Sequence, residues 1–536
     1  MSQSVTTPPS TAPVTSPYQA FSAAALHARL LPGLAVSGKL LWIVPLVVTV
    51  LGGLLRFINL SHPHMLIFDE TYYVKDAYAL LHYGHEMEWV EDSNAQFIAG
   101  SPQLEGGPSY VVHPPLGKWL IAGGMFLFGE FDGFGWRFAT ALFGTLSVLL
   151  VTLCAQRLFN SHALAAIAGL LLAIDGHSIV MSRTALLDIF LMFFVLAAFY
   201  ALLLDRTDGR RRLIRKLAVP AGNRVDYWTL RYGPMIWFRP WRLVAALMLG
   251  SAVGVKWSAL SFVAVFGILT VLWDMSARRT AGIRNWVVSG LWRDGALAFF
   301  TIIPLAAATY LATWSGWLAG TDGRYRNWAG ENPGEGVMWL PETLRSLWQY
   351  HVSAYGFHTG LDSPHSWQSP PWTWVFAGRP VLFYFEGYDE GVNECTVSRC
   401  TEVITDLPNP LMWWAAAISM FLLVFWWIGA RDWRAGAILS SVAAGFIPWL
   451  FYPERTMFFF YTLPLTPFMM LALTFMIGKF LPSSVGKPRM YQRRLVFVAV
   501  FLALLLLVSA YFWPLWSGEQ IPDTAWRSRV WIPSWS

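Results

Sequence analysis

Apolar runs of about 20 residues recur along most of this chain, and short polar segments separate them. A helix of that length covers the hydrocarbon core of a bilayer, which is ~30 Å thick. By run length, we expect spans at 40–60, 137–158, 163–181, 187–204, 242–256, 259–274, 296–315, 411–430, 435–451, 456–478 and 495–513. The pattern predicts an all-α polytopic membrane protein with about 11 transmembrane helices.

One further apolar segment, 114–129, is too short to be counted as a span. Its uncharged part, 119–129, reaches only ~16 Å as a helix, about half of the core. Leaving it out places the Arg/Lys-rich loops on the same side as the N-terminus, which the positive-inside rule assigns to the cytoplasm. These loops are 205–241, 275–294, 431–434 and 479–494. We therefore expect an inner N-terminus, an outer C-terminus, and segment 114–129 as a half-buried helix along the outer face.

This topology divides the chain into a transmembrane domain and two tails. The first 39 residues are rich in Ser, Thr and Pro and lack a signal-peptide pattern, which predicts a disordered cytoplasmic tail. Loops of the length expected on the outer face are usually functional, and we expect them to carry surface helices. The expected parts are a tail at 1–39, a transmembrane catalytic domain at 40–515 and an outer tail at 516–536. Within the catalytic domain, we expect outer loops at 61–136 and 316–410 and a basic cytoplasmic loop at 205–241.

Composition agrees with a membrane protein and argues against two other classes. Of the 536 residues, 55% are hydrophobic and only 13% are charged, and a soluble domain could not bury so much apolar surface. The net charge of +6 is explained by the cytoplasmic loops, so we expect no nucleic-acid partner. Three cysteines are too few for a disulfide scaffold. Cys395 and Cys400, in the second outer loop, are expected to form a disulfide, and Cys154, in the second span, to stay a free thiol.

Two adjacent acids, Asp69 and Glu70, stand near the start of the first outer loop, before the aromatic-rich stretch TYYVKDAYALLHYG. In a structural interpretation, Asp69 caps the following helix and Glu70 complements its dipole. In a chemical interpretation, a carboxylate at bilayer height acts on a substrate held there. Spacing alone leaves both interpretations open.

Four other charged residues are expected near the outer face. Lys118 and Arg137 are either interfacial cations or groups placed where a lipid phosphate would lie. Arg137 opens the second span at its outer end, against the positive-inside trend. Arg183 and Asp188 lie before the fourth span and at its top, and we expect them to pair with each other.

The second outer loop contains the aromatic stretch YHVSAYGFHTGLDSPHSWQSPPWTW at 350–374. Its rings and its histidines His351, His358 and His365 are typical of a sugar site, where they stack and hydrogen-bond, and equally of an interfacial aromatic belt. Histidines spaced by seven residues are not a recognised zinc motif.

Charges are rare within the spans themselves. The exceptions, Asp175, Asp188 and Lys256, all lie toward one face. An ion-coupled transporter should instead carry ionisable residues near the midplane and show paired repeats, and we find no convincing repeat.

Five stretches taken together resemble the protein O-mannosyltransferases, a family of the GT-C class of glycosyltransferases. They are FDETYY at 68–73, HPPLGK at 113–118, WRFATALFG at 136–144, SRTALLD at 182–188 and SPHSWQSPPWTW at 363–374. The resemblance extends over nearly the whole chain and is greatest to the actinobacterial members. It implies a GT-C fold with eleven spans and two large outer loops. The β-trefoil domain of the fungal and animal members does not fit in the second outer loop, which is too short.

The resemblance also implies an activity. Mannose would pass from polyprenyl phosphate mannose to Ser or Thr hydroxyls of exported proteins, at the outer face of the cell membrane. A base must take the hydroxyl proton, cations must hold the leaving phosphate, and a single displacement inverts the anomeric carbon. We assign Asp69 as the base, Glu70 as the group that orients it or the acceptor, and Lys118 and Arg137 as the phosphate ligands. Further candidate substrate contacts are His113, Arg183, Asp188, His351, His365, Trp367 and Trp372.

Two alternative functions share part of this pattern. A related GT-C enzyme could glycosylate a lipid or a cell-wall glycan, and a transporter of the polyprenyl lipid would move the donor without cleaving it. No cofactor is firmly expected, and a requirement for Mg²⁺ or Mn²⁺ is left open. Membrane lipids are expected partners, and coupling to the Sec translocon is a further hypothesis.

Overall fold

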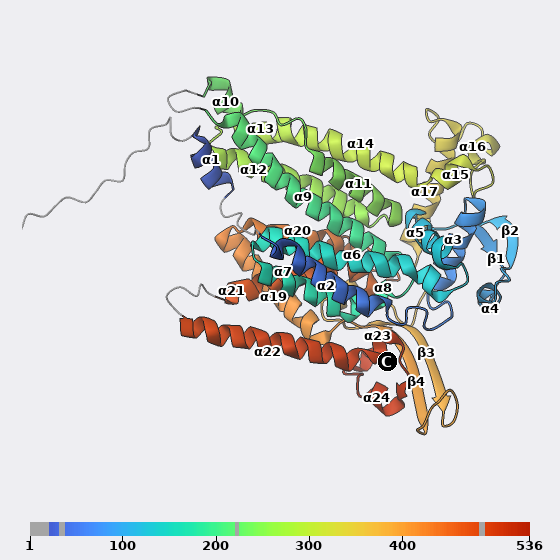
Figure 1. Ribbon diagram of the computed structural model, residues 1–536. Coiled ribbons are helices and arrows are strands. Elements are labelled where there is room, and N and C mark those ends of the chain that lie inside the picture. Colours follow the sequence, from blue (N-terminus) through green and yellow to red (C-terminus); the bar gives the residue numbers. More distant parts are fainter. Residues whose placement is uncertain (1–20, 32–37, 220–224, 482–487) are drawn as a thin grey trace, which may run out of the picture.

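The computed structural model describes residues 21–31, 38–219, 225–481 and 488–536. Within these ranges, nine helices are long and apolar enough to cross a membrane. They run side by side along the long axis of the molecule (Figure 1). They are α2 Leu40–Phe57, α6 Gly133–Phe159, α9 Asp188–Leu217, α12 Ala259–Ala281, α13–η2–α14 Trp286–Thr313, α19 Pro410–Ala430, α20–η3 Trp433–Phe451, η4–α21 Phe459–Phe480 and α22 Pro488–Phe512.

The remaining two predicted spans are also helical, but each departs from a single straight crossing. The span expected at 163–181 is a pair of helices, α7 His162–Ile174 and α8 Gly176–Ser182, bent by 60°. The break lies at Asp175, whose carboxylate accepts hydrogen bonds from the backbone N–H of Ser178 (3.1 Å) and of Asn409 (3.2 Å). The span expected at 242–256 is α11 Pro240–Val255, whose 16 residues reach ~24 Å. A multi-pass helical protein is therefore confirmed, and the count of eleven crossings stays a prediction.

Two predicted polar regions contain more helix than expected. Residues 1–20 and 32–37 of the expected tail lie outside the described residues, but α1 Ala23–Leu30 is ordered, and its Leu26 and Leu30 are buried against the ends of α9 and α12. Disorder was therefore the wrong prediction for residues 23–30. The basic segment 205–241 is not simply a loop, since α9 continues to Leu217 and α10 Tyr227–Tyr232 follows; residues 220–224 are not described.

The first large loop folds into a compact unit at one end of the bundle (Figure 1). It consists of α3 Glu70–Tyr83, β1 Met87–Trp89, α4 Asn94–Ile98, β2 Leu104–Pro108 and α5 Leu116–Phe128. The apolar face of α3, with Val74, Ala77 and Leu80, is buried within the protein, so α3 is not the surface helix that the pattern predicted. With only 13 residues, α5 is too short to be a full span, as expected. It packs closely on α6, where a Cβ on Gly135 would lie 1.9 Å from the carbonyl oxygen of Gly129.

The second large loop lies at the same end of the bundle (Figure 1). Its elements are α15 Ser315–Ala319, α16 Trp328–Glu331, α17 Glu342–Gly360, α18 Pro371–Trp374, β3 Val381–Asp389 and β4 Arg399–Asp406. The final segment adds α23 Pro514–Ser517, β5 Ile521–Pro522, α24 Asp523–Arg527 and η5 Pro533–Trp535. Strand β4 pairs antiparallel with β3 and β5. The described residues thus form a mainly helical fold with two small sheets in the loops, and the predicted helical fold class is confirmed.

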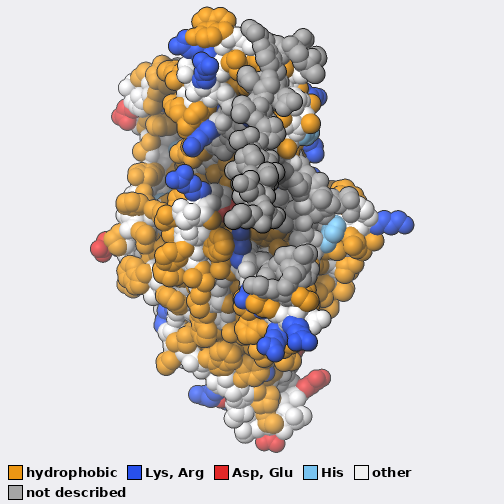
Figure 2. Space-filling view, turned by 90° about the vertical axis from the view of Figure 1, so that its left-hand side faces the viewer, with side chains coloured by type: hydrophobic (Ala, Val, Ile, Leu, Met, Phe, Trp, Pro, Cys, Tyr) orange, Lys and Arg blue, Asp and Glu red, His pale blue; other side chains and the backbone are white. Residues whose placement is uncertain are grey.

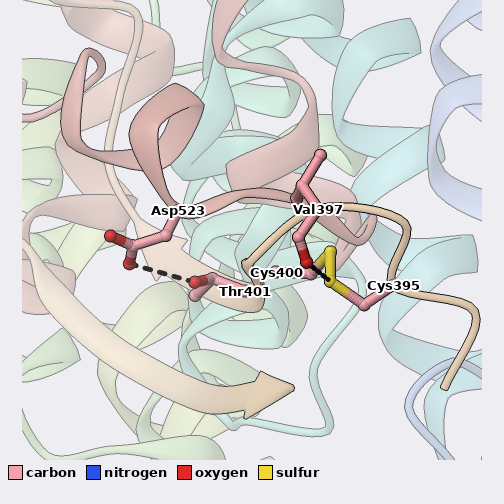
Figure 3. The surroundings of a disulfide bond; sticks show 5 residues. All are labelled: Cys395, Val397, Cys400, Thr401 and Asp523. Atoms are coloured by element: carbon pink, nitrogen blue, oxygen red, sulfur yellow. Dashed lines mark hydrogen bonds between the residues drawn. A yellow bond between two sulfur atoms is a disulfide. The ribbon is translucent and has the colours of Figure 1, made fainter. Parts of the chain in front are cut away.

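A disulfide closes the turn between β3 and β4. It joins Cys395 to Cys400, as predicted, and Cys154 is a buried free thiol. Beside the disulfide, the Thr401 hydroxyl donates to the Asp523 carboxylate at 3.3 Å (Figure 3), which links the final segment to β4. The indole of Trp535 is also buried and donates to the carbonyl of Ala377 at 2.8 Å. The segment 516–536 is therefore packed on the second large loop and is not a separate tail.

Candidate active site

Asp69 lies immediately before α3 with its carboxylate unoccupied. It holds the N-cap position, but its side chain makes no capping hydrogen bond, and the described parts of the chain give it no hydrogen-bond or ion-pair partner. The purely structural interpretation of this residue is therefore not supported. Burial, together with the nearby Asp188 carboxylate, raises the pKa of Asp69 to about 6, although Lys256 acts in the opposite direction. A carboxylate with this pKa is mostly ionised at pH 7 and is more basic than an ordinary aspartate.

Glu70, its neighbour, is completely buried and fully bonded. The guanidinium of Arg137 donates to both of its oxygens at 2.8 Å. The backbone N–H groups of Ile67 (3.0 Å) and Ala185 (2.8 Å) donate to the same carboxylate. Glu70 thus ties the start of α3 to α6 and to the segment before α9. It fixes the backbone that carries Asp69, which supports a positioning role.

Arg137 does not have the geometry of a phosphate ligand. Besides its two bonds to Glu70, it donates to the carbonyl oxygens of Leu60, Pro63 and Met65 at 2.9–3.3 Å. All of its N–H donors are used inside the protein, and its side chain is 0% exposed. The prediction failed because an arginine at the outer end of a span can satisfy a buried carboxylate as well as a lipid phosphate.

The Lys118 ammonium is also paired within the protein. Its ammonium forms an ion pair with Glu86 and a second with Asp76 at 3.6 Å, and its side chain is 1% exposed. The lysine joins α5 to α3 and to the segment after α3. Its assignment as a phosphate ligand is therefore also contradicted by the geometry.

A different pair of cations lines a pocket of about 300 Å³ at this end of the bundle. Lys256, in the break between α11 and α12, donates to the Asp188 carboxylate at 2.7 Å. Its ammonium has no other hydrogen-bond partner in the described chain, and it faces the rings of Phe460 and Tyr461 at 5.8 and 5.5 Å. Asp188 therefore pairs with Lys256, and its predicted pairing with Arg183 was wrong.

Arg455, in the turn between α20 and α21, is the second cation. Its Nε donates to the carbonyl oxygen of His358 at 2.9 Å, and its guanidinium lies over the rings of Trp449 and Tyr461. Its Nη1 is buried and has no hydrogen-bond partner in the structure. An unsatisfied charged donor in a pocket is costly unless a ligand accepts from it. The pocket therefore suits an anion.

Two imidazoles complete the polar lining of this pocket. His113 and His358 lie with their rings 5.2 Å apart. Burial, and the nearby Lys256 and Arg455, lower the pKa of His358 to about 4 and that of His113 well below its usual value. Both rings are therefore neutral at pH 7. His358 donates to the carbonyl oxygen of Val112 at 2.8 Å and accepts from Arg455 at 3.4 Å, so His113 is the ring that can hydrogen-bond a ligand without adding charge. The prediction of His113 as a substrate contact agrees with this placement.

Asp69 and the pocket are neighbours. The charge of Asp69 interacts with those of Lys256 and Asp188. Burial raises the pKa of Tyr73, and the charges of Asp69 and Asp188 raise it further, so this ring lies near both acids. The ring of Phe68, the residue before Asp69, stacks on Phe383 of β3 at 4.7 Å. Both large loops therefore contribute to one site.

The remaining predicted residues lie at varied distances from this site. His365 is exposed and meets Phe68 edge-on at 6.4 Å, so it borders the site. Trp367 stacks with Arg379, and Trp372 is 61% exposed, with neither in the pocket lining. Arg183 donates to carbonyl oxygens at the end of α2, which makes it structural. The ring of His351 stacks on that of Trp257, a residue of the pocket lining, and accepts a hydrogen bond from the Tyr310 hydroxyl. His351 therefore lies behind the pocket wall.

The sequence interpretation missed Lys256, His358, Arg455 and Tyr461 as site residues. Lys256 stood out as a rare charge within a span, and His358 as part of the aromatic stretch, but neither was assigned a role. Arg455 had the same signal as Arg137, since it lies at the outer end of a predicted span against the positive-inside trend. Only the hydrogen bonds separate these two arginines.

Comparison with known proteins identifies the family. The model named dolichyl-phosphate-mannose-protein mannosyltransferase matches residues 46–217, and the model of the C-terminal four-transmembrane region of protein-O-mannosyltransferase matches 343–535. The polyprenol-phosphate-mannose–protein mannosyltransferase of Mycolicibacterium smegmatis (strain MKD8) is 37% identical over 504 residues, which cover 92% of this chain and 93% of the relative. This chain belongs to the protein O-mannosyltransferase family. The enzyme of the same name from Mycobacterium tuberculosis (strain H37Rv) is 35% identical, with 92% of each chain covered.

A solved structure of the same family shares the fold. The Saccharomyces cerevisiae Pmt1–Pmt2 complex bound to the sugar donor superposes with a TM-score of 0.66 and 16% identity, over 96% of this chain and 94% of that one. The predicted GT-C architecture and the assignment as a glycosyltransferase of this family are thereby confirmed.

Proposed function

We propose that this enzyme transfers mannose from polyprenyl phosphate mannose to Ser and Thr hydroxyls of exported proteins, with Asp69 as the catalytic base. Family membership supports the lipid-linked donor and the protein acceptor. The observation that carries the assignment to this site is the unoccupied Asp69 carboxylate beside the pocket of Lys256 and Arg455.

The donor phosphate binds in that pocket. Arg455 offers Nη1, which has no partner within the protein, and Lys256 offers the N–H groups that Asp188 leaves free. Charge-assisted hydrogen bonds of this kind are the strong ones, and an arginine can grip two phosphate oxygens. The neutral imidazole of His113 supplies a further contact, and His358 holds Arg455 in place. The rings of Trp257, Trp449 and Tyr461 provide an apolar lining.

The reaction is a single displacement at the anomeric carbon. As the acceptor hydroxyl oxygen attacks, its proton passes to Asp69, and the bond between the anomeric carbon and the phosphate oxygen breaks. The electron pair of that bond leaves with the phosphate, which becomes a monoester held by Lys256 and Arg455. Attack from the opposite face inverts the configuration. No acid of raised pKa is needed, because the cations stabilise the leaving charge.

The acceptor peptide approaches past the second large loop. The stretch SPHSWQSPPWTW carries the exposed His365 and Trp372, and His365 borders Phe68 beside the base. Exposed aromatic and polar groups next to a catalytic carboxylate are suited to holding an extended Ser/Thr-rich segment. Coupling of this approach to the Sec translocon remains a hypothesis.

A divalent metal is not assigned a role. Among the described residues, no group of three or more His, Cys, Asp or Glu side chains could hold a metal ion. Mg²⁺ needs only one or two carboxylates beside a substrate phosphate, so the divalent cation stays an untested expectation. Within the pocket lining, the cations next to the leaving phosphate are Lys256 and Arg455.

The site faces the outside of the cell membrane in this proposal, and the N-terminus lies in the cytoplasm. The support is the charge distribution, because the end of the bundle opposite Asp69 carries many of the arginines and lysines, as the positive-inside rule requires. The donor, made on the inner leaflet, would be used on the outer leaflet, where exported proteins emerge.

The test is transfer by the purified protein. It is incubated with polyprenyl phosphate mannose and a Thr/Pro-rich peptide, and the peptide is weighed by mass spectrometry. We expect a gain of one hexose with inverted anomeric configuration, together with free polyprenyl phosphate. Mannose appearing only on an added lipid or glycan acceptor would assign the enzyme to another GT-C activity, and movement of intact donor without cleavage would make it a transporter.

A further inference from the structure

A second and larger pocket lies at the opposite end of the bundle, where α1, α6, α9, α12, α19 and α20 meet. Its volume is about 820 Å³. Six arginines and one carboxylate, Asp432, line it. The arginines are Arg29, Arg157, Arg206, Arg210, Arg431 and Arg434. Figure 2 shows this end of the molecule, where Lys and Arg side chains are more frequent than Asp and Glu among the described residues. We call this feature the arginine pocket.

Among the lining residues of the arginine pocket, Asp432 is the carboxylate, and two cations already share it. The Asp432 carboxylate is bound bidentately by Arg434 and lies 3.6 Å from Lys479. Arg206 and Arg431 form no ion pair in the described ranges. Nearby clusters differ, because Arg239 and Arg242 are neutralised by Asp205 and Asp274, at 2.6–3.3 Å. Arg206 and Arg431 therefore differ from this neutralised cluster.

Two of these arginines also contain unsatisfied buried donors. The Nε atoms of Arg206 and Arg210 are buried and have no hydrogen-bond partner in the structure. Arg210 is 8% exposed and uses Nη1 to donate to the Leu30 carbonyl at 2.8 Å, while the Arg206 guanidinium lies flat over Trp433, 3.5 Å from its ring centroid. An ordinary cytoplasmic arginine extends into water, whereas these two turn inward, which favours a bound anion.

The surroundings of the arginine pocket indicate that the anion belongs to a lipid. Leu272 of α12 and Trp427 of α19 line the pocket and are 52% and 51% exposed. Further along the same helices, Ile268, Phe425 and Ile428 are also exposed, as expected of lipid-facing surfaces. A headgroup among the arginines could therefore continue into acyl chains past Leu272 and Trp427. Basic pockets between helices near a membrane surface suit such headgroups.

We propose that the arginine pocket binds the phosphate headgroup of an anionic membrane lipid, with Arg206, Arg210 and Arg431 as its ligands. The bound lipid joins α1 to α9, α12, α19 and α20, and so stabilises this end of the bundle. The proposal does not depend on the transferase reaction, because the pocket lies at the far end of the bundle from Asp69 and shares no lining residue with the donor pocket.

The experiment is native mass spectrometry of the full-length protein in a neutral detergent. Separate titrations use phosphatidylglycerol, polyprenyl phosphate, phosphatidylcholine and inorganic phosphate. The variants are Arg206→Gln and Arg431→Gln, and the matched control is Arg211→Gln, an exposed arginine on the same helix as Arg206 that is not in the pocket lining. Thermal unfolding is recorded with and without phosphatidylglycerol.

We expect saturable binding of phosphatidylglycerol, with a dissociation constant that rises about fivefold in each pocket variant and is unchanged in Arg211→Gln. Phosphatidylglycerol should raise the melting temperature of the wild type, and it should raise that of the pocket variants by a smaller amount. Within the described ranges, the Arg431 side chain is exposed and forms no hydrogen bond or ion pair, so its variant should fold even if Arg206→Gln does not. Displacement of phosphatidylglycerol by polyprenyl phosphate in the wild type alone would support the proposal and identify the lipid.

Three results would overturn it. One is equal phosphatidylglycerol binding by the wild type and Arg431→Gln, which removes the arginine pocket as the site. Another is equally tight binding of phosphatidylcholine, which removes the need for a net negative charge. The third is displacement by inorganic phosphate at the same concentration, which makes the ligand a soluble phosphate and not a lipid.

Discussion

Asp69 and Glu70 are adjacent in the chain, yet they belong to regions of opposite character. Glu70 and Arg137 form a closed, buried cluster in which every charge and every guanidinium donor has a partner. Asp69 lies beside a pocket lined by Lys256 and Arg455, and among the described residues its carboxylate and one guanidinium nitrogen of Arg455 have no partner. The first region holds the second in place. The comparison teaches that the chemistry lies where polar groups are left unsatisfied and not merely where charges gather.

Arg137→Gln tests the closed cluster and should have the largest effect. The variant leaves Glu70 buried without its partner, which typically lowers the free energy of unfolding by ~3–5 kcal/mol. Thermal unfolding and the yield of folded protein in detergent measure this loss. Arg455→Gln is the matched comparison and should lower the free energy of unfolding by ~1 kcal/mol, because the hydrogen bonds that it removes are partly exposed. A stable Arg137→Gln protein with weakened donor binding would restore Arg137 as a phosphate ligand.

Arg455→Gln tests the open pocket. It removes a charged hydrogen bond worth ~1.5–3 kcal/mol from the phosphate, so kcat/KM for the donor should fall about 10–100-fold. The KM for the acceptor peptide should not change. The control is Arg399→Gln, an exposed arginine of β4 outside the pocket. Donor kinetics that are the same in both variants would rule out this phosphate site.

The pH dependence distinguishes the two carboxylates without a mutation. A base must be ionised, and the pKa of Asp69 is raised to about 6, so kcat/KM should fall as the pH falls through that value. The expected loss is about tenfold between pH 7 and pH 5. His358, with a pKa lowered to about 4, stays neutral over this range. A rate that is level from pH 7 to pH 5 would mean that the base has an ordinary carboxylate pKa.

Opening the disulfide should have the smallest effect. Cys395 and Cys400 close a very short loop on the turn between β3 and β4, away from both regions. Replacing both by Ser should lower the free energy of unfolding by about 2 kcal/mol or less and leave transfer unchanged. Thermal unfolding and peptide mass measure these outcomes, with Cys154→Ala as the control. Peptides from unreduced protein that contain two free thiols would contradict the bond itself.

Much of the fold could be predicted from the sequence because membrane spans depend on local composition. Each predicted span, found by its run length, lies on a helix, and run length correctly left 114–129 out of the full-length spans. The small sheets were missed, since the outer loops were searched for apolar runs of membrane length, and β3 and β4, with nine and eight residues, are too short to form one. The helix α1 was missed because its stability comes from burial of Leu26 and Leu30 on distant helices, which a local Ser/Pro-rich composition does not reveal.

Only part of the candidate site could be predicted, because the rest depends on contacts between distant parts of the chain. Asp69 and His113 lie in motifs near the site, and sequence reasoning selected both. It chose Lys118 and Arg137 over Lys256 and Arg455, because a sequence does not show which donors of a cation are used inside the protein and which are left for a ligand. Glu86 and Asp76, which occupy Lys118, are separated from it by 32 and 42 residues, so their pairing is visible only after folding.

The central claim is that Asp69 is the base, and single-turnover transfer by Asp69→Asn tests it most directly. The substitution keeps the size of a side chain that makes no capping bond, so the protein should fold and bind the donor with nearly unchanged affinity. With donor and acceptor both saturating, we predict a rate at least ~10²-fold below that of the wild type. A near-normal rate in a folded, donor-bound Asp69→Asn protein would contradict the account and remove Asp69 from the reaction.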